Sequence, residues 1–461
     1  MDRTADALAV FGITGDLAHR MTLPALYRLE VRSLLPCPVI GLGRANWDAA
    51  QLRQRARAAI EEAEGRIDEQ AFERLANRLD YVSGDATDPE VYARLAKALA
   101  GAERPVFYLA TPPSLFGPVI EALGAAGLTR DARVVIEKPF GADLASARDL
   151  NRRILEVLEE DQVYRIDHFL GKEPVQDIVY LRFANEIFEP VWNRYHVRSV
   201  QINLAEEVDV AERGSFYDQV GALRDVVQNH LLQVLALVTM EPPAGGRDAI
   251  ADRRLDVLRA IPDADPEAHV RGQYDGYHDV KGVRPGSDTE TFVALRLGVD
   301  NWRWSGVPFL IRAGKALPTT ATEVDVQFRR PPAILMGDHV EEVPHHNHIT
   351  LRIGRDAGAS VGVLLKEPAR DRSEPVHLDL SFQDQLGAAP GPYERLLSDA
   401  LTGDGTLFPR QDVIEETWRI VQPLLDAPPP VEPYEKGSWG PAEADRLVAG
   451  FGGWRPPGRK H

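Results

Sequence analysis

Side chains that can bind an anion and move a proton occur together in one eight-residue stretch. Residues 165–172 read Arg-Ile-Asp-His-Phe-Leu-Gly-Lys, which places a carboxylate, an imidazole and two cations in one segment. Such groups can hold an anionic substrate and assist a proton transfer. His168 and Lys172 are four residues apart with Gly171 between them, so both can converge on one anion. A charge-rich surface loop can show the same mixture, so other motifs must decide between the two interpretations.

A glycine turn opens the chain. The apolar run at residues 8–11 leads directly into Gly12-Ile13-Thr14-Gly15-Asp16-Leu17, and a helix is expected to begin near Asp16. Gly12 and Gly15 would let the backbone approach a pyrophosphate at the start of that helix. The spacing is Gly-x-x-Gly rather than the fuller Gly-x-Gly-x-x-Gly, and an ordinary strand-to-helix turn would read the same way. Its position directly after the first predicted strand favours a dinucleotide site.

The end of the second predicted strand indicates which dinucleotide is bound. A site specific for NAD usually has an acidic residue there, which binds the ribose 2′-hydroxyl. Here the strand ends with residues 41–46, Gly-Leu-Gly-Arg-Ala-Asn, and Asp48 is expected to cap the next helix. Arg44 could bind a 2′-phosphate through charge-assisted hydrogen bonds, which favours NADP. The alternative is an exposed surface arginine.

Two further segments carry candidate polar groups. A buried-type run at residues 133–136 is followed by Glu-Lys-Pro-Phe-Gly, which would place Lys138 at the ligand edge of a parallel sheet. Asp225 and Asn229 are four apart and share a helical face, whereas His230 is angularly offset from both. His230 could be a base or a core histidine. Nucleotide turn, anion site and second histidine together suggest hydride transfer on a phosphorylated substrate.

Two kinds of hydrophobic pattern divide the chain near residue 170. The first half alternates apolar runs with helical stretches, which predicts a parallel sheet covered by helices, an α/β domain over residues 1–172. The second half has a helical stretch at 220–240 and then period-2 runs, which predicts antiparallel strands in a larger α+β domain over residues 173–461. The predicted strands are 8–11, 39–41, 81–82, 106–110, 134–137 and 163–166, then 291–297, 323–328, 349–353 and 376–382. The boundary would place the cluster at 167–172 between domains, where ligands commonly bind.

Composition limits the classes of function. The 461 residues include 53 Lys plus Arg and 70 Asp plus Glu, a net charge of −17. That charge disfavours nucleic-acid or anionic-membrane binding. Cys37 is the one cysteine, so an intramolecular disulfide is impossible. The N-terminal residues lack the apolar core of a signal peptide, and the apolar run at 231–240 is far too short for a membrane span. A soluble, cytoplasmic protein is therefore expected, with no metal site.

Six motifs, in order along almost the whole chain, resemble the glucose-6-phosphate dehydrogenase family. They are Phe-Gly-Ile-Thr-Gly-Asp-Leu-Ala at 11–18, Glu-Lys-Pro-Phe-Gly at 137–141, Arg-Ile-Asp-His-Phe-Leu-Gly-Lys at 165–172, Gln-Asn-His at 228–230, Arg-Ala-Gly-Lys at 312–315 and Tyr-Glu-Lys-Gly-Ser-Trp-Gly-Pro at 434–441. The resemblance implies a Rossmann-like NADP-binding domain followed by a substrate-binding domain whose sheet builds a dimer interface. It also implies oxidation of glucose 6-phosphate at C1 to the phosphogluconolactone, with a homodimer or homotetramer as the assembly.

The resemblance assigns roles to individual residues. His230 would be the general base that takes the C1 hydroxyl proton, and Asp167 would orient it. His168 and Lys172 would hold the 6-phosphate. The remaining implied contacts are Glu206, Asp225 and Lys315 for the sugar or its surroundings, and Gly12, Thr14, Gly15, Asp16, Leu17, Arg44, Asp85 and Lys138 for NADP.

Three positions depart from the common family pattern, at Met21, Phe169 and Thr320. Many members have Lys, Tyr and Lys there, so phosphate affinity is expected to be weaker. Two alternatives therefore stay open. One is a related dehydrogenase of an unphosphorylated sugar, and the other is a non-catalytic NADP-binding sensor, although the latter would be expected to have lost Asp167, His230 or Lys138.

Overall fold

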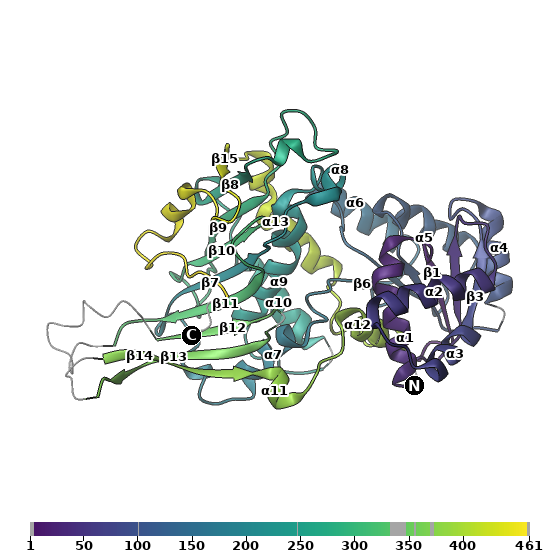
Figure 1. The fold of residues 1–461 in the computed structure, drawn as a ribbon, viewed down its shortest axis with the longest axis horizontal. Helices are drawn as coiled ribbons and strands as arrows, with labels where there is room; N and C mark the ends of the chain where they lie inside the picture. Colours follow the sequence, from purple (N-terminus) through teal and green to yellow (C-terminus); the bar gives the residue numbers. More distant parts are fainter. Residues whose placement is uncertain are drawn as a thin grey trace. The chain divides into compact units, whose positions relative to one another are not determined.

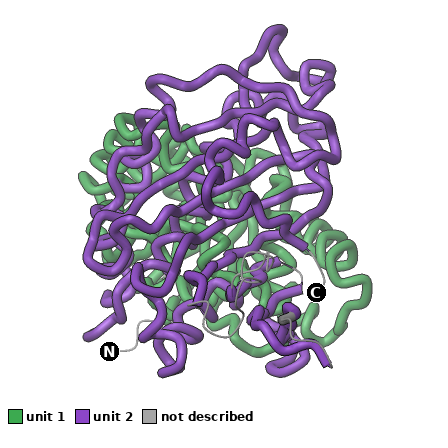
Figure 2. The backbone as a smooth tube through the Cα atoms, turned by 90° about the vertical axis from the view of Figure 1, so that its left-hand side faces the viewer, with its two compact units in different colours: residues 1–172, 390–415 green, residues 173–389, 416–461 purple. Residues whose placement is uncertain are grey.

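A computed structural model describes residues 4–99, 101–246, 248–331, 347–354, 356–368 and 373–458. The chain forms two compact units, shown in different colours in Figure 2. Unit 1 comprises residues 1–172 and 390–415, and unit 2 comprises residues 173–389 and 416–461. Residues 390–415, which the sequence prediction grouped with the second half, thus belong to unit 1. The functional labels given to 1–172 and 173–461 stay predictions.

Unit 1 is built on a parallel sheet. Its described residues form six strands in the order β3-β2-β1-β4-β5-β6, and every neighbouring pair is parallel. This is the strand order of dinucleotide-binding Rossmann folds. The predicted α/β sheet is confirmed, because each of the six predicted runs is a strand. The strands are β1 (Ala7–Phe11), β2 (Val39–Gly43), β3 (Leu79–Ser83), β4 (Pro105–Leu109), β5 (Arg133–Ile136) and β6 (Val163–Arg165).

Helices cover both faces of this sheet. On one face α1 packs against α2, α3 and α12, and on the other α5 packs against α4 and α6. Asp48 caps α2 in a capping box with Gln51, as the sequence predicted, and Asp88 caps α4, which has Pro89 in its first turn. The helices are α1 (Leu23–Val31), α2 (Ala49–Glu64), α3 (Glu69–Arg78), α4 (Pro89–Ala98), α5 (Phe116–Ala125), α6 (Leu144–Leu155) and α12 (Pro392–Thr402), with the π-helix η1 (Ala18–Thr22) and the 3₁₀ turns η2 (Pro113–Leu115) and η3 (Glu160–Gln162).

Unit 2 is built on a larger, mainly antiparallel sheet. Its described residues form nine strands in the order β14-β13-β12-β11-β7-β10-β9-β8-β15, which can be followed in Figure 1. The predicted antiparallel architecture is confirmed, and two pairs, β7 with β10 and β8 with β15, are parallel. The strands are β7 (Val197–Ala205), β8 (His269–Tyr274), β9 (Phe292–Leu297), β10 (Phe309–Gly314), β11 (Ala321–Phe328), β12 (His348–Arg352), β13 (Gly358–Lys366), β14 (Ser373–Ser381) and β15 (Val431–Tyr434).

The helical part of unit 2 contains a wide π-helix. Residues Leu223–Leu231 form the π-helix η6, which continues into α9 (Leu232–Thr239) and lies against β10. None of the described helices has the length and apolar character of a membrane span. The other helices are α7 (Glu173–Phe183), α8 (Gly214–Tyr217), α10 (Ala249–Arg259), α11 (Phe382–Leu386) and α13 (Gln411–Asp426), with the 3₁₀ turns η4 (Glu189–Val191), η5 (Ala211–Arg213), η7 (Pro266–Ala268), η8 (Tyr277–Asp279) and η10 (Ala442–Val448).

Candidate active site

The glycine turn of unit 1 has the geometry of a phosphate cradle. Gly12 follows β1 with a positive φ of 79°, and a Cβ placed there would lie 2.3 Å from the carbonyl oxygen of Ala110. Only glycine fits that conformation at such close range. The chain becomes helical at Asp16, so the turn leads from the carboxyl end of β1 directly into the start of a helix, the part of a helix that favours a phosphate. The turn therefore suits the pyrophosphate of a dinucleotide, the cofactor that the sequence predicted.

Arg44 and Asp85 lie at the same edge, after β2 and β3. Both side chains are exposed. The pKa of Asp85 is lowered, first by hydrogen bonds from Thr87 and then by the positive charge of Arg44. Thr14 packs beside Gly43, where a Cβ would lie 2.9 Å from the Thr14 hydroxyl oxygen. The structure thus brings the predicted cofactor residues of β1, β2 and β3 together around one edge.

Lys138 follows β5, and the preceding residue is a deeply buried carboxyl group. The Lys138–Pro139 peptide bond is cis, and the Lys138 side chain is half-buried. Glu137 is buried and accepts hydrogen bonds from the hydroxyls of Tyr108 at 2.7 Å and Tyr393 at 3.4 Å. Burial raises its pKa from 4.5 to about 7, against the lowering effect of these bonds and of Lys138. Sequence reasoning singled out Lys138 and missed Glu137 and its two tyrosines.

The predicted anion site is a compact loop after β6. The Asp167 carboxylate is buried and accepts a hydrogen bond from the Phe169 amide at 2.9 Å. The loop closes through the amides of Leu170 and Lys172, which donate to the carbonyls of Asp167 and Phe169 at 3.0 Å. The Lys172 ammonium lies 3.5 Å from the centre of the Phe169 ring. We call residues 167–172 the phosphate loop, after the ligand that the sequence analysis predicts for them.

Helix α12 forms the wall behind the phosphate loop. A Cβ at Gly171 would lie 2.8 Å from the Pro392 carbonyl oxygen and 2.9 Å from the Leu396 side chain. The ring of Tyr393 lies almost parallel to that of His168, with 13° between the planes and 6.4 Å between centroids. Phe169 meets the same imidazole edge-on, with 5.2 Å between centroids. The absence of a side chain at Gly171 therefore lets a helix from late in the chain shape this loop.

In unit 2, Glu206 and Lys315 come together at the ends of β7 and β10. Their side chains form an ion pair of 2.5 Å, and the Glu206 amide donates to the carbonyl of Gly314 at 3.0 Å. The Lys315 ammonium also lies 5.3 Å from the ring centre of Tyr217. Tyr217 is buried, and its pKa is raised by burial first and then by nearby carboxylates, of which Asp225 is the first. Three predicted sugar-binding residues thus surround Tyr217, which the sequence did not single out.

Asp225 and His230 lie on the π-helix η6. Sequence reasoning assumed an α-helix, on which residues five apart are offset. A π-helix bonds residue i to i+5, so residues five apart come closer to one face, and such helices are rare and frequent at functional sites. His230 is buried, with 1% of its surface exposed, whereas Asp225 is half-buried. The backbone amide of His230 donates to the side chain of Asn229 at 2.6 Å.

The three departures from the family pattern have distinct surroundings. Phe169 supports Lys172, as described above. The Thr320 hydroxyl accepts a hydrogen bond of 3.0 Å from the backbone amide of Glu207. Met21 is exposed on η1, the π-helix that follows the glycine turn. Thr320 is thus bonded to the segment that directly follows β7 and carries Glu206.

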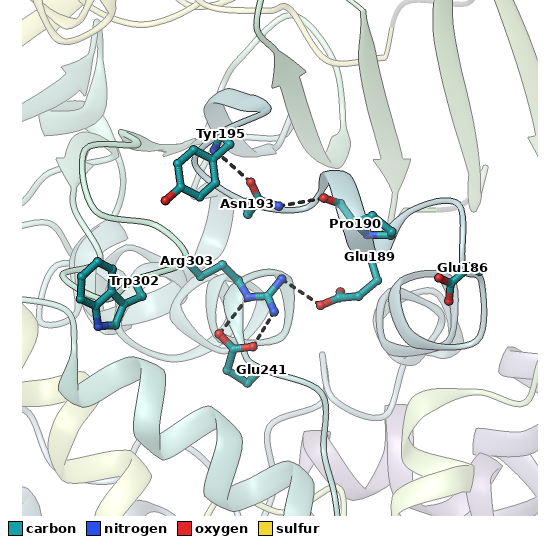
Figure 3. Close-up of a pocket in the computed structure, with 8 residues that line it drawn as sticks. All are labelled: Glu186, Glu189, Pro190, Asn193, Tyr195, Glu241, Trp302 and Arg303. Carbon is teal, nitrogen blue, oxygen red and sulfur yellow. Dashed lines mark hydrogen bonds and ion pairs between the residues drawn. The ribbon is translucent and has the colours of Figure 1, made fainter.

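Unit 2 also has a surface pocket made of residues that the sequence did not assign (Figure 3). Its volume is about 460 Å³. Arg303 points to Glu189 at 2.8 Å and to Glu241 at 2.5 Å, so two carboxylates compensate its charge. The lining residues are Glu186, Glu189, Pro190, Asn193, Tyr195, Glu241, Trp302 and Arg303. An acidic pocket of this kind does not suit a phosphorylated sugar.

Each unit carries its own set of candidate functional groups. Unit 1 supplies the glycine turn, Arg44, Lys138 and the phosphate loop, which suit a dinucleotide and an anion. Unit 2 supplies the buried imidazole of His230 and the carboxylates and ammonium group around Tyr217. The groups of unit 1 can bind an anion and a dinucleotide, and those of unit 2 can accept a proton and bind polar hydroxyl groups.

Comparison with known proteins matches almost the whole chain to one family. Residues 9–177 match the family description "Glucose-6-phosphate dehydrogenase, NAD binding domain", and residues 179–455 match the C-terminal domain of the same family. Glucose-6-phosphate 1-dehydrogenase 1 of Mycobacterium tuberculosis is 50% identical over 98% of this chain and 97% of its own length. The enzyme of Dickeya dadantii is 40% identical over 96% of each chain.

Solved structures give the same result. A crystal structure of glucose-6-phosphate 1-dehydrogenase from Mycobacterium avium is 50% identical, with a TM-score of 0.92 over 99% of this chain and 100% of that one. A glucose-6-phosphate dehydrogenase in complex with its substrate glucose-6-phosphate is 32% identical, with a TM-score of 0.91 over 99% of this chain and 100% of that one. This chain belongs to the glucose-6-phosphate dehydrogenase family.

Proposed function

We propose that this protein oxidises C1 of glucose 6-phosphate to 6-phosphogluconolactone and transfers the hydride to NADP. The observation that carries the proposal is the phosphate loop, in which His168 and Lys172 follow a β-strand at the same sheet edge as the glycine turn. A solved relative that shares the fold binds glucose 6-phosphate. This supports an anion site next to a dinucleotide site in the present chain.

His230 is the proposed general base. Its imidazole would take the proton of the C1 hydroxyl as the hydride leaves C1, so that C1 becomes the lactone carbonyl. NADP, when bound, supplies the hydride acceptor. Asp167 is proposed to orient His230 and to stabilise the imidazolium that forms, which is the usual role of a buried carboxylate beside a catalytic histidine. Both groups are buried, which supports these roles, because charge interactions are stronger away from water.

The other proposed substrate contacts form two groups, one in each unit. His168 and Lys172 would hold the 6-phosphate as charge-assisted donors. Glu206, Asp225 and Lys315 would contact sugar hydroxyls or fix the groups that do. The ion pair between Glu206 and Lys315 supports this, because it holds both groups in one orientation without an added ligand.

The proposed cofactor residues are Gly12, Thr14, Gly15, Asp16, Leu17, Arg44, Asp85 and Lys138. Gly12 supports the fit, because a side chain there would fill the place where the turn approaches Ala110. NADP is proposed over NAD because an exposed arginine, Arg44, follows β2 where NAD-specific sites carry an acidic residue. Lys138 is proposed to lie near the nicotinamide end, since it follows β5 at the same edge.

We also propose a homo-oligomer, a dimer or a tetramer, in the cytoplasm. In the sheet formed by the described residues β14 is an edge strand, and Val376, Leu378 and Leu380 are exposed at every second position along it. Side chains at every second position share one face of the sheet, and an exposed apolar patch of this kind often marks an interface with another chain. Sedimentation of a Leu378→Glu variant as a smaller species would support this face of β14 as the interface. A cytoplasmic location is consistent with the single, buried Cys37.

The decisive experiment is a steady-state assay with glucose 6-phosphate or glucose and with NADP or NAD. We expect reduction of NADP with glucose 6-phosphate to have the highest kcat/KM. His230→Ala should lower kcat by about 10²–10⁴-fold with little change in KM, the range for positioned acid–base groups. A preference for glucose would support the dehydrogenase of an unphosphorylated sugar, and absence of turnover with every pair would support a non-catalytic NADP-binding protein.

A further inference from the structure

A chain of buried polar contacts connects the end of β5 to the phosphate loop. The Glu137 carboxyl group accepts hydrogen bonds from Tyr108, on β4, and from Tyr393, on α12. The Tyr393 ring then lies parallel to the His168 imidazole at 6.4 Å. Tyr108, Glu137 and Tyr393 are all less than a tenth exposed. None of these three has a role in the reaction proposed above.

The arrangement restricts the His168 ring on two sides. Phe169 contacts the imidazole edge-on, and Tyr393 stacks on it in an offset, nearly parallel manner. Aromatic pairs at such separations are attractive and prefer particular geometries. Tyr393 cannot easily turn away, because its hydroxyl is bonded to Glu137 and its helix touches Gly171. The orientation of the His168 imidazole is therefore restricted by a residue more than two hundred positions away in sequence.

We propose that Tyr393, held by Glu137, is a positioning residue that fixes the His168 imidazole for binding the substrate phosphate. This inference rests on the proposed function, because it takes His168 as a phosphate ligand. It predicts an effect on phosphate recognition that is separate from the proton transfer at His230. Tyr393 acts through its ring, and Glu137 acts through Tyr393.

The test compares single and double variants of the full-length protein. His168→Ala should raise KM for glucose 6-phosphate by about 10- to 100-fold, as for loss of a hydrogen bond to a charged group. Tyr393→Leu should raise it by about 5- to 30-fold, which lies within the range for coupled neighbours, with kcat changed little. In a His168→Ala background, Tyr393→Leu should add almost nothing. Inhibition by inorganic phosphate should weaken in parallel, whereas kcat/KM for glucose should stay the same.

Control variants separate positioning from loss of fold. Tyr393→Phe keeps the ring and should have a smaller effect than Tyr393→Leu. Glu137→Ala should raise KM for glucose 6-phosphate, and the conservative Glu137→Gln should restore most of the wild-type value. Leu401→Ala removes another buried side chain of the same helix and should lower stability without changing KM.

Two results would overturn the inference in distinguishable ways. In the first, His168→Ala raises KM, and Tyr393→Leu raises KM by the same factor in the wild type and in the His168→Ala variant. Tyr393 then does not act through His168, and the proposed function stands. If His168→Ala leaves KM for glucose 6-phosphate and inhibition by phosphate unchanged, His168 is not a phosphate ligand. In that case the proposed phosphate site fails, and the positioning role fails with it.

Discussion

Phe169 supports the Lys172 ammonium, although many family members have a tyrosine there. The ammonium lies 3.5 Å from the ring centre, within the range of a cation–π interaction. Phe169→Leu should therefore raise KM for glucose 6-phosphate by about 2- to 30-fold, corresponding to the strength of such contacts. Phe169→Tyr keeps the ring face and should match or improve on the wild type. Equal KM values for all three proteins, in assays with varied glucose 6-phosphate, would contradict this role.

Arg44 is the residue on which the choice of NADP depends. It is exposed after β2, and its charge lowers the pKa of Asp85 across the sheet edge. Arg44→Ala should raise KM for NADP by about 10- to 100-fold through loss of a charged hydrogen bond, and leave KM for NAD nearly unchanged. Arg130→Ala, at a highly exposed residue, serves as a control for lost surface charge. A similar rise for both cofactors would show that Arg44 serves the fold or the adenine instead.

Glu137 should make stability depend on pH near neutrality. Below pH 4.5 the group is protonated in both states, and between 4.5 and about 7 only the folded state keeps the proton, so stability falls as pH rises. The difference between these values corresponds to roughly 3 kcal/mol above pH 7. Glu137→Gln should therefore raise the unfolding free energy relative to wild type at pH 8 and change it little at pH 5.

Chemical denaturation at both pH values checks this prediction. The exposed Glu103 provides a matched control, and Glu103→Gln should leave stability nearly unchanged at either pH. A Glu137→Gln variant that is equally destabilised at pH 5 and pH 8 would contradict the expected protonation of the folded state. The two tyrosine partners remain in every case, because glutamine can still accept a hydrogen bond.

The sequence could suggest those site residues that lie in a recognisable local pattern. Gly12, Arg44, Lys138 and the phosphate loop each follow an apolar run, and the carboxyl ends of parallel strands meet at one edge. Tyr393 gives no such signal, because its relation to His168 depends on a contact between distant segments. Tyr217 likewise gains its charged surroundings only when β7, β10 and η6 come together.

Among the elements, η6 shows how helix type can escape prediction. A helix over 220–240 follows from its apolar pattern, and the structure contains one. The change from i→i+4 to i→i+5 bonding depends on packing, since η6 lies against β10 and Gln228 bonds to Thr417 at 2.9 Å. As a result the face shared by Asp225 and His230 could not be read from α-helical spacing.

The contact between α12 and the phosphate loop yields a prediction about Gly171. A methyl group there would collide with the backbone carbonyl of Pro392, which cannot move without shifting the helix. Gly171→Ala should lower the unfolding free energy by about 1–3 kcal/mol, as for overpacking, and raise KM for glucose 6-phosphate more than it lowers kcat. Gly405→Ala, where the added carbon would meet nothing within 4 Å, is the control. Wild-type thermal stability and KM in Gly171→Ala would show that the loop and α12 are less tightly packed.

At the scale of the whole molecule, the order of the strands and helices in unit 1 could be predicted from the sequence, but the boundaries of unit 1 could not. The alternation of apolar runs with helical stretches predicted the parallel sheet, because the residues of each apolar run indicate by themselves that the run is buried. The assignment of residues 390–415 to unit 1 could not be predicted this way. The apolar face of α12 indicates that this helix is buried, but it does not indicate which part of the protein covers it. In unit 2 the strands with period-2 patterns were predicted, whereas β7 and β10, which are buried along almost their whole length, show little alternation.

The discontinuity of unit 1 leads to a prediction about its independent folding. Residues 390–415 contribute Tyr393, Leu396, Leu397, Ala400, Leu401, Leu407 and Phe408 to the core that covers one face of the parallel sheet. The Ala5 amide also donates to the carbonyl of Leu401 at 2.7 Å, next to β1. Burying these large side chains contributes on the order of 10 kcal/mol, which is comparable to the whole stability of a domain.

A fragment of residues 1–172 should therefore fail to fold stably, although it contains every strand of the parallel sheet. A fusion of 1–172 to 390–415 through a short glycine–serine linker should fold cooperatively, because Gly171 and Pro392 are already in contact. Circular dichroism should show a single thermal transition for the fusion alone, and the fluorescence of added NADPH should report binding to it. A fusion carrying Leu396→Ala and Leu401→Ala should lose that transition. Cooperative unfolding and NADPH binding by 1–172 alone would mean that the sheet does not need α12.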